Sequence, residues 1–289
     1  MPPRSVLFFA TAVIGFGSAF SMTNVAVATM SPLWVAAGRS VIAMLALWAF
    51  LFATRRPVTF DRAHLKLYIS IGTFTGVLPY LLISWGQQHI DSGLGGVLFA
   101  SAPLLTLVIG YLAFNAPRPG KSTILGAILG LCGVALAFVS PLSITTSALL
   151  GSAATVSAAA SYAVGGLLIQ NSKTKDIIGL TALQLVPSSL ILVLCATLLG
   201  GNSVQTVSVQ SYSALIGLGI IGTCVPLLSL FALVAREQAK VASLTTFFIP
   251  FVALVNGTVF LNEPLAPLSI VGLLAALFGT FLISPNRQK

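Results

Sequence analysis

The sequence predicts an all-α membrane protein of ten transmembrane helices, built as two inverted five-helix repeats. Three observations support this prediction: the apolar composition, the one-sided distribution of basic residues, and prolines that recur at a fixed spacing. Of the 289 residues, 57% are hydrophobic and only 7% are charged, with a mean hydropathy of +1.03. About a quarter of a soluble chain is charged, so this composition excludes a soluble globular domain.

The apolar residues gather into blocks of about 20, the length that a helix needs to cross a hydrocarbon core of roughly 30 Å. Backbone amides in lipid must be satisfied within their own segment, and short alternating strands do not occur, so each block is predicted to be a helix. The block after Arg4 resembles a signal peptide, but nine further blocks follow and favour a first span. The ten blocks are 5–26, 33–53, 66–87, 94–114, 121–139, 148–170, 178–199, 211–234, 242–261 and 267–284.

The net charge of +9 is distributed unevenly between the two sides of these predicted helices. The loops on the side opposite the N-terminus, 27–32, 88–93, 140–147, 200–210 and 262–266, hold no basic residue. This split follows the positive-inside rule and predicts an inner-membrane protein with both termini in the cytoplasm. We therefore expect the protein to contact membrane lipid and to bind no nucleic acid. The N-terminal side holds 13 of the 14 basic residues: Arg4, Arg55, Arg56, Arg62, Lys66, Arg118, Lys121, Lys173, Lys175, Arg236, Lys240, Arg287 and Lys289.

Prolines and glycines recur at an offset of 147 residues. The matched pairs are Pro79 with Pro226, Pro103 with Pro250, Pro117 with Pro264, Gly72 with Gly219 and Gly110 with Gly257. Because prolines are scarce, their match at one gap-free offset predicts a duplicated unit, with a first copy at 1–141 and a second copy at 148–289. Each copy holds five spans, an odd number, so the second copy enters the membrane from the opposite side. Such inverted repeats are typical of transporters that work by alternating access to a site between the halves.

Short motifs add a family resemblance to this pattern. The sequences GSAF at Gly17–Phe20, AAGRS at Ala36–Ser40 and P…NEP between Pro250 and Pro264 resemble the EamA-type drug/metabolite transporter superfamily over nearly the whole chain. The resemblance implies an exporter of amino acids, other metabolites or toxic compounds, with a central cavity formed by predicted helices 1, 3, 4, 6, 8 and 9. Two positions depart from the pattern: Ala116 replaces the acidic residue that matches Glu263, and Gln184 stands where the second copy aligns with Arg39.

Four prolines inside the predicted spans are candidate hinges: Pro79, Pro103, Pro226 and Pro250. A proline removes one backbone hydrogen bond and leaves free the carbonyl four residues earlier. The freed carbonyls would be those of Thr75, Phe99, Gly222 and Thr246. Static kinks would explain the prolines as well, but their symmetric pairing favours hinges that gate a cavity and carbonyls that could hold a substrate ammonium group.

A polar stripe on the third predicted helix is the main candidate for substrate binding. Tyr80, Ser84 and Gln88 are spaced by four, with Trp85 beside them. Polar atoms that face lipid are costly, so the stripe should face protein or water. Trp85 is equally well explained as an interfacial belt residue. Further candidates for an uncharged cavity with aromatic walls, each of which could instead serve packing, are Asn24, Phe99, Tyr162, Phe231, Thr246, Phe247 and Phe248.

Charged side chains are almost absent from the predicted spans. Arg39 is the one exception, and it could snorkel, pair structurally, or bind a substrate carboxylate. No Asp or Glu lies in the core of a predicted helix. A strict proton antiporter needs such a carboxylate, so we expect facilitated or weakly coupled transport.

The leading hypothesis is an inner-membrane transporter that exports small amphipathic metabolites, above all amino acids with aromatic or hydrophobic side chains. The narrower substrate range rests on the family resemblance. An exporter of organic cations or drugs is the alternative, and a membrane enzyme is disfavoured because no buried acid–base pair or metal cluster is present. We therefore expect no catalytic residue, metal or cofactor.

Glycine rows at 126, 130 and 133 and at 272 and 279, with Ala276 between the last two, suit packing within the bundle, so a monomer or weak dimer is expected. The three cysteines, all in apolar blocks, are expected to be buried packing thiols.

Overall fold

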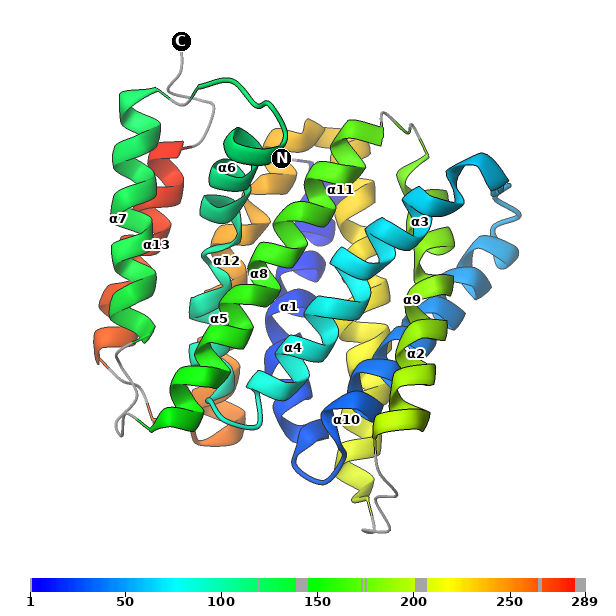
Figure 1. Cartoon of the computed structure of the whole chain (residues 1–289), viewed down its shortest axis with the longest axis horizontal. Helices are drawn as coiled ribbons and strands as arrows, with labels where there is room; N and C mark the ends of the chain where they lie inside the picture. Colours follow the sequence, from blue (N-terminus) through cyan, green and yellow to red (C-terminus); the bar gives the residue numbers. More distant parts are fainter. Residues whose placement is uncertain are drawn as a thin grey trace.

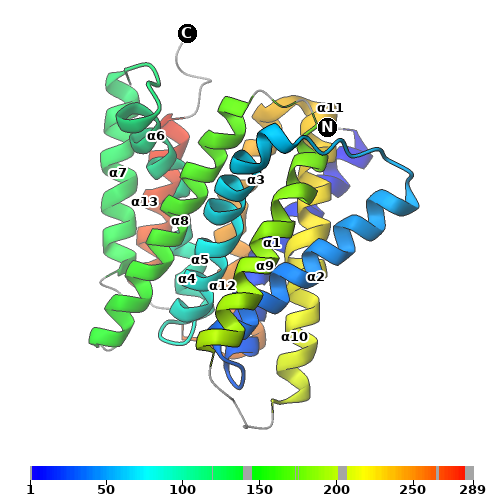
Figure 2. The ribbon, with the colours of Figure 1, turned by 45° about the vertical axis from the view of Figure 1, so that its right-hand side comes forward.

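The computed structural model describes residues 2–118, 120–138, 145–172, 174, 176–200, 207–264 and 267–283. All regular secondary structure in these ranges is helical, and the helices form a bundle with connecting segments at its two ends (Figures 1 and 2). Three shorter apolar helices, at Thr123–Leu136, Thr245–Leu261 and Ile270–Gly279, accompany seven segments that are long and apolar enough to cross a membrane. The seven are Pro3–Val27, Pro32–Ala53, Arg62–Gly86, Ser92–Ala113, Thr146–Ser172, Ile177–Leu199 and Val209–Arg236.

The first two helices, α1 (Pro3–Val27) and α2 (Pro32–Ala53), are joined by a short loop. Pro3 and Pro32 occupy the first turns, where the missing N–H would have had no partner within the helix. Ser31 caps α2, and its hydroxyl accepts a hydrogen bond from the N–H of Trp34. These local signals explain where both helices begin.

The third predicted helix contains a wider turn in its middle. It consists of α3 (Leu65–Gly72), the π-helix η2 (Thr73–Val77) and α4 (Leu78–Gly86). The corresponding segment of the second copy consists of α10 (Val209–Gly219), the π-helix η3 (Ile220–Cys224) and α11 (Val225–Ser243). The two π-helices are 147 positions apart at both ends, the same offset as the prolines. Asn115 and Asn262, also 147 apart, both adopt φ of 53°. The repeat is therefore visible in the backbone itself.

Each π-helix precedes one member of a proline pair. Pro79 follows η2 and Pro226 follows η3 in the first turn of the next helix. A proline ring clashes with the carbonyl four residues back, and a π-helix relieves this by shifting the hydrogen bond to the fifth residue. Accordingly, the N–H of Leu78 donates to the carbonyl of Thr73. The sequence predicted a distortion at these prolines but not its form.

The other proline pair is treated differently in the two copies. In the first copy, a turn at Ala100 and Ser101 interrupts the helix between α5 (Ser92–Phe99) and α6 (Ala102–Ala113), just before Pro103. In the second copy, α12 (Thr245–Leu261) continues through Pro250 without a break. The two copies therefore share their elements but not the conformation of this one.

The directions of the helices agree with an inverted repeat. In Figure 1, α1 begins at the end of the bundle where α8 (Thr146–Ser172) finishes, so the first helices of the two copies run in opposite directions. The last helix, α13 (Pro267–Ile283), finishes at the end where α1 begins (Figures 1 and 2). The remaining elements are α7 (Lys121–Phe138), α9 (Ile177–Leu199) and the short 3-10 turn η1 (Arg62–His64).

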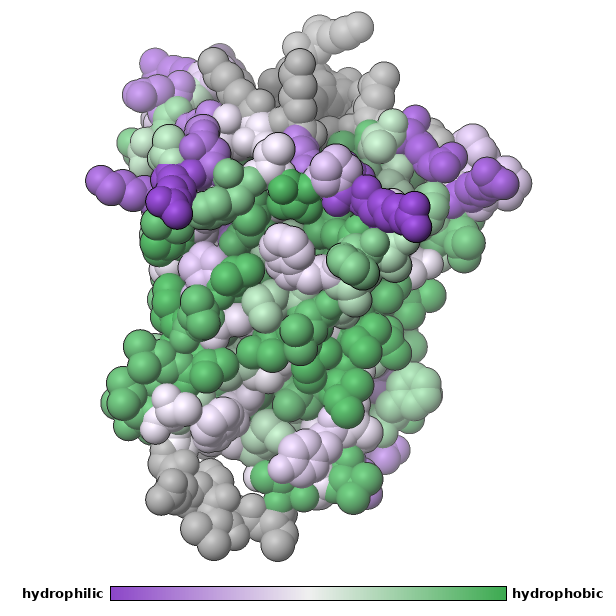
Figure 3. Space-filling model, turned by 90° about the vertical axis from the view of Figure 1, so that its right-hand side faces the viewer, coloured by the Kyte–Doolittle hydropathy of each residue, from purple (hydrophilic) through white to green (hydrophobic). Residues whose placement is uncertain are grey.

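The surface has the polarity of a membrane protein. Figure 3 shows hydrophobic residues over the middle of one face and most of the strongly hydrophilic ones towards the end where α1 begins. Large side chains such as Phe52, Leu112 and Phe260 are 89%, 75% and 72% exposed, which suits contact with lipid. Arg55, Arg56, Arg62 and Arg118 are exposed. Residue 141, Lys173, Lys175, Arg287, Lys289 and the side chain of Lys240 lie outside the described residues.

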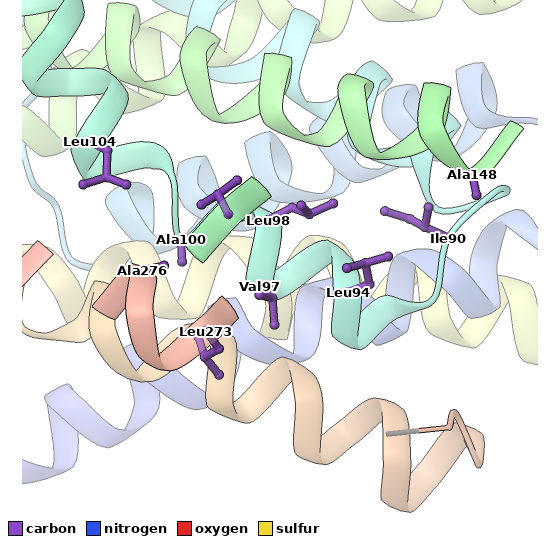
Figure 4. Close-up of a cluster of buried hydrophobic side chains, with 10 residues drawn as sticks. Ile90, Leu94, Val97, Leu98, Ala100, Leu104, Ala148, Leu273 and Ala276 are labelled. Carbon is purple, nitrogen blue, oxygen red and sulfur yellow. The ribbon is translucent and has the colours of Figure 1, made fainter. Parts of the chain in front are cut away.

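A large apolar core lies where both copies meet. It joins α5 to α8 and α13, as the close-up in Figure 4 shows. Next to it, the glycine rows of α7 and α13 face each other: a Cβ at Gly133 would lie 2.5 Å from the carbonyl oxygen of Gly272. The predicted packing of these rows within the bundle is confirmed. The buried core residues are Ile90, Leu94, Val97, Leu98, Ala100, Leu104, Val134, Ala148, Leu273 and Ala276.

The cysteines differ from the expectation that all three are buried. Cys224 is buried in η3, Cys195 is half-buried, and Cys132 is exposed on α7. The prediction was wrong for Cys132 because an apolar span has a lipid-facing side, which its hydropathy does not distinguish from the side facing the bundle.

Candidate functional site

Three aromatic side chains from both copies form a continuous row inside the helix bundle. The ring centroids of Phe20 on α1 and Phe99 at the end of α5 are 5.6 Å apart, and those of Phe99 and Tyr162 on α8 are 5.5 Å apart. The Phe99 and Tyr162 rings meet edge to face, at 90°. We call these three residues the aromatic row. It brings together two of the predicted site residues, Phe99 and Tyr162, and adds Phe20, which the sequence analysis did not select as a binding residue.

Tyr80 continues this row on the third helix. Its side chain is 3% exposed and its hydroxyl interacts with that of Tyr162. Tyr162 packs both on the apolar cluster that contains Tyr80 and on the one that contains Phe20. Tyr162 thereby links α4 to α1 and α5 across the boundary between the copies.

Arg39 lies over the ring of Tyr80. Its Cζ atom is 4.1 Å from the centroid of the Tyr80 ring, a cation–π contact, and its Nε donates to the hydroxyl of Thr223 at 3.0 Å. Thr223 lies inside η3, and its hydroxyl donates a hydrogen bond to the carbonyl of Leu218 at 2.8 Å. Arg39 is only 4% exposed, so an ion-pair partner would be expected for its charge. The ion pairs of the described residues, Arg56 with Asp176 and His64 with Asp61, do not include it.

Gln184 makes the equivalent contact in the other copy. The hydroxyl of Thr75, inside η2, donates to the side-chain oxygen of Gln184 on α9 at 2.6 Å. Gln184 aligns with Arg39 in the repeat, so each copy extends a polar side chain from its second helix to a threonine in the π-helix of the other. We call these two contacts the cross-copy bridges. One bridge is charged and the other is neutral.

The polar stripe on the third helix ends at Gln87 and not at the predicted Gln88. Tyr80 and Ser84 are buried, but Gln88 is exposed and the neighbouring Gln87 is only 2% exposed. Seven residues return a helix to within about 20° of the same face, whereas eight overshoot it by about 80°. A spacing of i, i+4, i+7 would therefore have selected Gln87. Its amide nitrogen and oxygen have no hydrogen-bond partner among the described residues, and neither has the Ser84 hydroxyl.

The other predicted binding residues are placed less centrally. Trp85 is 37% exposed and its ring meets that of His89, with centroids 4.6 Å apart, which fits the interfacial alternative. Phe248 is 49% exposed and packs on Phe9 of α1. Phe231, Thr246 and Phe247 are half-buried, and no ring contact between described residues joins these two phenylalanines to the aromatic row. Asn24 is occupied structurally, since its side-chain nitrogen donates to the backbone carbonyl of Gln87 at 3.1 Å.

Carbonyl groups around the bend of the third helix have partners from the second copy. The Ser161 hydroxyl on α8 donates to the carbonyl of Phe74, and the Ser188 hydroxyl on α9 donates to that of Gly72, both at 2.9 Å. Neither serine could be identified from the sequence, because each is far from the bend along the chain. Hydroxyl groups from α8 and α9 therefore already bind these two carbonyls.

Two carboxylates meet at the start of α5. Glu263, in the turn after α12, accepts hydrogen bonds from the N–H groups of Ser92 and Gly93 at 2.7 and 2.9 Å. It thus caps the N-terminus of α5. Partial burial and the nearby charge of Glu263 raise the pKa of Asp91, whose side chain still reaches the surface. The described residues contain no group of three or more metal-ligating side chains.

Comparison with known proteins places this geometry in a family. The model of the EamA-like transporter family matches residues 3–139 and again residues 146–284. One crystal structure of a protein shares the fold, with a TM-score of 0.68, 14% identity and 99% of both chains covered. The family model therefore matches the chain twice, once in each half.

Curated relatives are similar over nearly their whole length. The uncharacterized transporter YoaV of Bacillus subtilis (strain 168) is 26% identical over 92% of both chains. A probable terminal-alkyne amino-acid exporter of Streptantibioticus cattleyicolor is 26% identical over 99% of this chain and 94% of its own. A probable amino-acid metabolite efflux pump of Salmonella typhimurium is 23% identical over 93% of this chain and 91% of its own.

Proposed function

The chain belongs to the EamA-like transporter family, and from this premise we propose that it exports small amphipathic metabolites, above all amino acids with aromatic or hydrophobic side chains. The aromatic row carries the proposal. An aromatic or aliphatic side chain that moves between the two copies would meet Phe20, Phe99 and Tyr162, and each aromatic pair adds about 0.5–1.5 kcal/mol beyond area burial. The names of two relatives, an amino-acid exporter and an amino-acid metabolite efflux pump, support the same substrate class.

Alternating access is the mechanism that suits two inverted copies. The broken helix before Pro103 and the unbroken helix through Pro250 are two conformations of equivalent segments. If the copies exchanged these conformations, the passage between them would open to the other side of the membrane. One chain contains both copies, so the proposed transport unit is a monomer, with any dimer weak.

Counterflow in liposomes tests the substrate class. Liposomes that contain the purified protein and are loaded with unlabelled L-phenylalanine should accumulate radiolabelled L-phenylalanine transiently, and preloaded leucine or tryptophan should replace it. Phe99→Ala should reduce this counterflow strongly, whereas Phe52→Ala, at a side chain 89% exposed on α2, should not. Counterflow of an organic cation but of no amino acid would favour the drug-exporter alternative instead.

The proposed orientation places both termini in the cytoplasm of a cell whose inner membrane holds the protein. A green fluorescent protein fused after Lys289 should fluoresce, and alkaline phosphatase fused there should be inactive. A fusion placed after Ser208, at the start of α10, should give the reverse result. Termini on opposite sides of the membrane would overturn the inverted arrangement and alternating access with it.

A further inference from the structure

We propose that Arg39 binds the carboxylate of the transported molecule, so that the substrates are carboxylates or zwitterions and not organic cations. This inference rests on the proposed function, because it concerns the substrate of the same passage. It names the chemical group that the passage recognises, which the family membership leaves open.

The charge of Arg39 is poorly compensated within the protein. A guanidinium group is not deprotonated in proteins, and an isolated buried charge is strongly unfavourable unless an opposite charge pairs with it. Its observed partners are the face of the Tyr80 ring and the neutral hydroxyl of Thr223. Among the side chains that the structure describes, which leave out Glu237, no Asp or Glu lies within ion-pair distance of it. A bound carboxylate would supply the missing charge.

The free donors of Arg39 have the geometry for this role. A guanidinium carries five N–H donors, and only the one on Nε makes a hydrogen bond to a described residue. The two terminal nitrogens are therefore left to donate side by side, which is the arrangement that binds a carboxylate through both oxygens. Stacking on Tyr80 and the bond to Thr223 hold the plane of the group in place.

The surroundings of Arg39 match an amphipathic acid. Arg39 stacks on Tyr80, Tyr80 contacts Tyr162, and Tyr162 meets Phe99 in the aromatic row. A molecule with a carboxylate at one end and a hydrophobic side chain at the other can satisfy both parts together. An organic cation would meet an unpaired positive charge at the same place.

The equivalent bridge of the other copy argues against a purely structural role. Gln184 connects its helix to Thr75 in η2 without any charge, at a hydrogen-bond distance of 2.6 Å. A neutral side chain is therefore sufficient to join the second helix of one copy to the π-helix of the other. Arg39 performs the same connection with a charge that the connection does not need.

The test replaces Arg39 with the residue of the neutral bridge. In liposome counterflow, Arg39→Gln should raise the half-saturating concentration of L-phenylalanine by roughly tenfold or more, since loss of one partner weakens a buried charge pair strongly. Arg39→Lys, which keeps the charge but not the paired donors, should lie between Arg39→Gln and the wild type. Arg56→Gln, at an exposed arginine paired with Asp176, should leave the value unchanged. An unchanged half-saturating concentration in Arg39→Gln overturns the proposal.

A second measurement does not depend on the folding of a variant. In thermal unfolding of the detergent-solubilised wild type, L-phenylalanine should raise the melting temperature, whereas phenethylamine, which lacks the carboxylate, should not. Equal stabilisation by both compounds overturns the proposal. If no amino acid shows counterflow but phenylpyruvate does so in an Arg39-dependent way, the amino-acid function fails while the carboxylate site stands.

Discussion

Arg39 and Thr223 form a hydrogen bond of 3.0 Å that joins the two copies, and Gln184 and Thr75 form its counterpart at 2.6 Å. In both cases a side chain from a second helix meets a threonine inside a π-helix that a proline follows. The same bend therefore accommodates the proline and presents a hydroxyl to the opposite copy. The two copies are coupled at the positions where their long helices are distorted, which are the positions that a conformational change would move.

Removal of the two threonine hydroxyls should have unequal effects. Thr223→Val leaves a buried charged donor without its partner, and we expect a loss of about 1–3 kcal/mol in stability. Thr75→Val leaves the buried, neutral side-chain oxygen of Gln184 without this donor and should cost about 1 kcal/mol, the low end of the same range, because no charge is involved. Thermal unfolding of the two variants in the same detergent measures the difference. A Thr75→Val variant as damaged as Thr223→Val would contradict the special status of the charged bridge.

The stability of the protein should depend on pH through Asp91. Its pKa is raised above the ordinary value of 3.8, by burial first and by Glu263 second, so the folded chain holds this proton more tightly than the unfolded chain does. The stabilising contribution is full below the ordinary pKa and is lost as the pH rises through the folded value. Asp91→Asn should therefore raise the melting temperature at pH 7 and change it little at pH 3.

Asp61 provides a control of opposite sign for this titration. The N–H of Ala63, followed by His64, lowers the pKa of Asp61 in an exposed turn. Its contribution is present above the ordinary pKa and disappears as the pH falls through the folded value. Asp61→Asn should slightly lower the melting temperature at pH 7. A gain in Asp61→Asn equal to that in Asp91→Asn would show that removal of charge alone explains the effect.

The seam between α7 and α13 should not tolerate a larger residue. A Cβ at Gly133 would lie 2.5 Å from both the carbonyl oxygen of Gly272 and the nitrogen of Ala276, and backbone atoms cannot move aside easily. Gly133→Ala should cost about 1–3 kcal/mol through overpacking. Gly166→Ala on α8 is the matched control, because nothing lies within 4 Å of its added carbon. Equal melting temperatures for both variants and the wild type would contradict close packing of α7 against α13 at Gly133.

The hinge prolines make a kinetic prediction. Pro79→Ala restores a backbone N–H, removes the need for the π-helix before it, and should stiffen the third helix. We expect transport to slow by roughly tenfold, which corresponds to about 1.4 kcal/mol in the barrier, with little change in expression. Pro250→Ala should act in the same direction, because α12 needs a flexible point in the alternative conformation. Counterflow rates normalised to purified protein measure both effects, and unchanged rates would mean that these prolines are static kinks.

Local patterns were sufficient for much of the architecture. Hydropathy alone located the helices, because the length of a span is set by the thickness of the bilayer. The recurrence of Pro79 and Pro103 at 147 positions located the repeat, and its odd number of spans implied the inversion. Hydrophobicity could not show which face of a span meets lipid, and for this reason Cys132 was expected inside. The choice of Gln88 over Gln87 came instead from a spacing of four residues, which drifts away from one helix face after two turns.

The sequence by itself determined that this protein is a helical membrane protein with two related halves, since span length, proline positions and basic loops are properties of short segments. Only the tertiary structure decided that Arg39 meets Thr223, 184 positions away, and that Ser161 meets the carbonyl of Phe74, 87 positions away. Such contacts depend on the rotation and crossing of whole helices. Those are set by the packing of small residues such as Gly72 and Gly219 against neighbouring helices, and no local pattern records which neighbour that is.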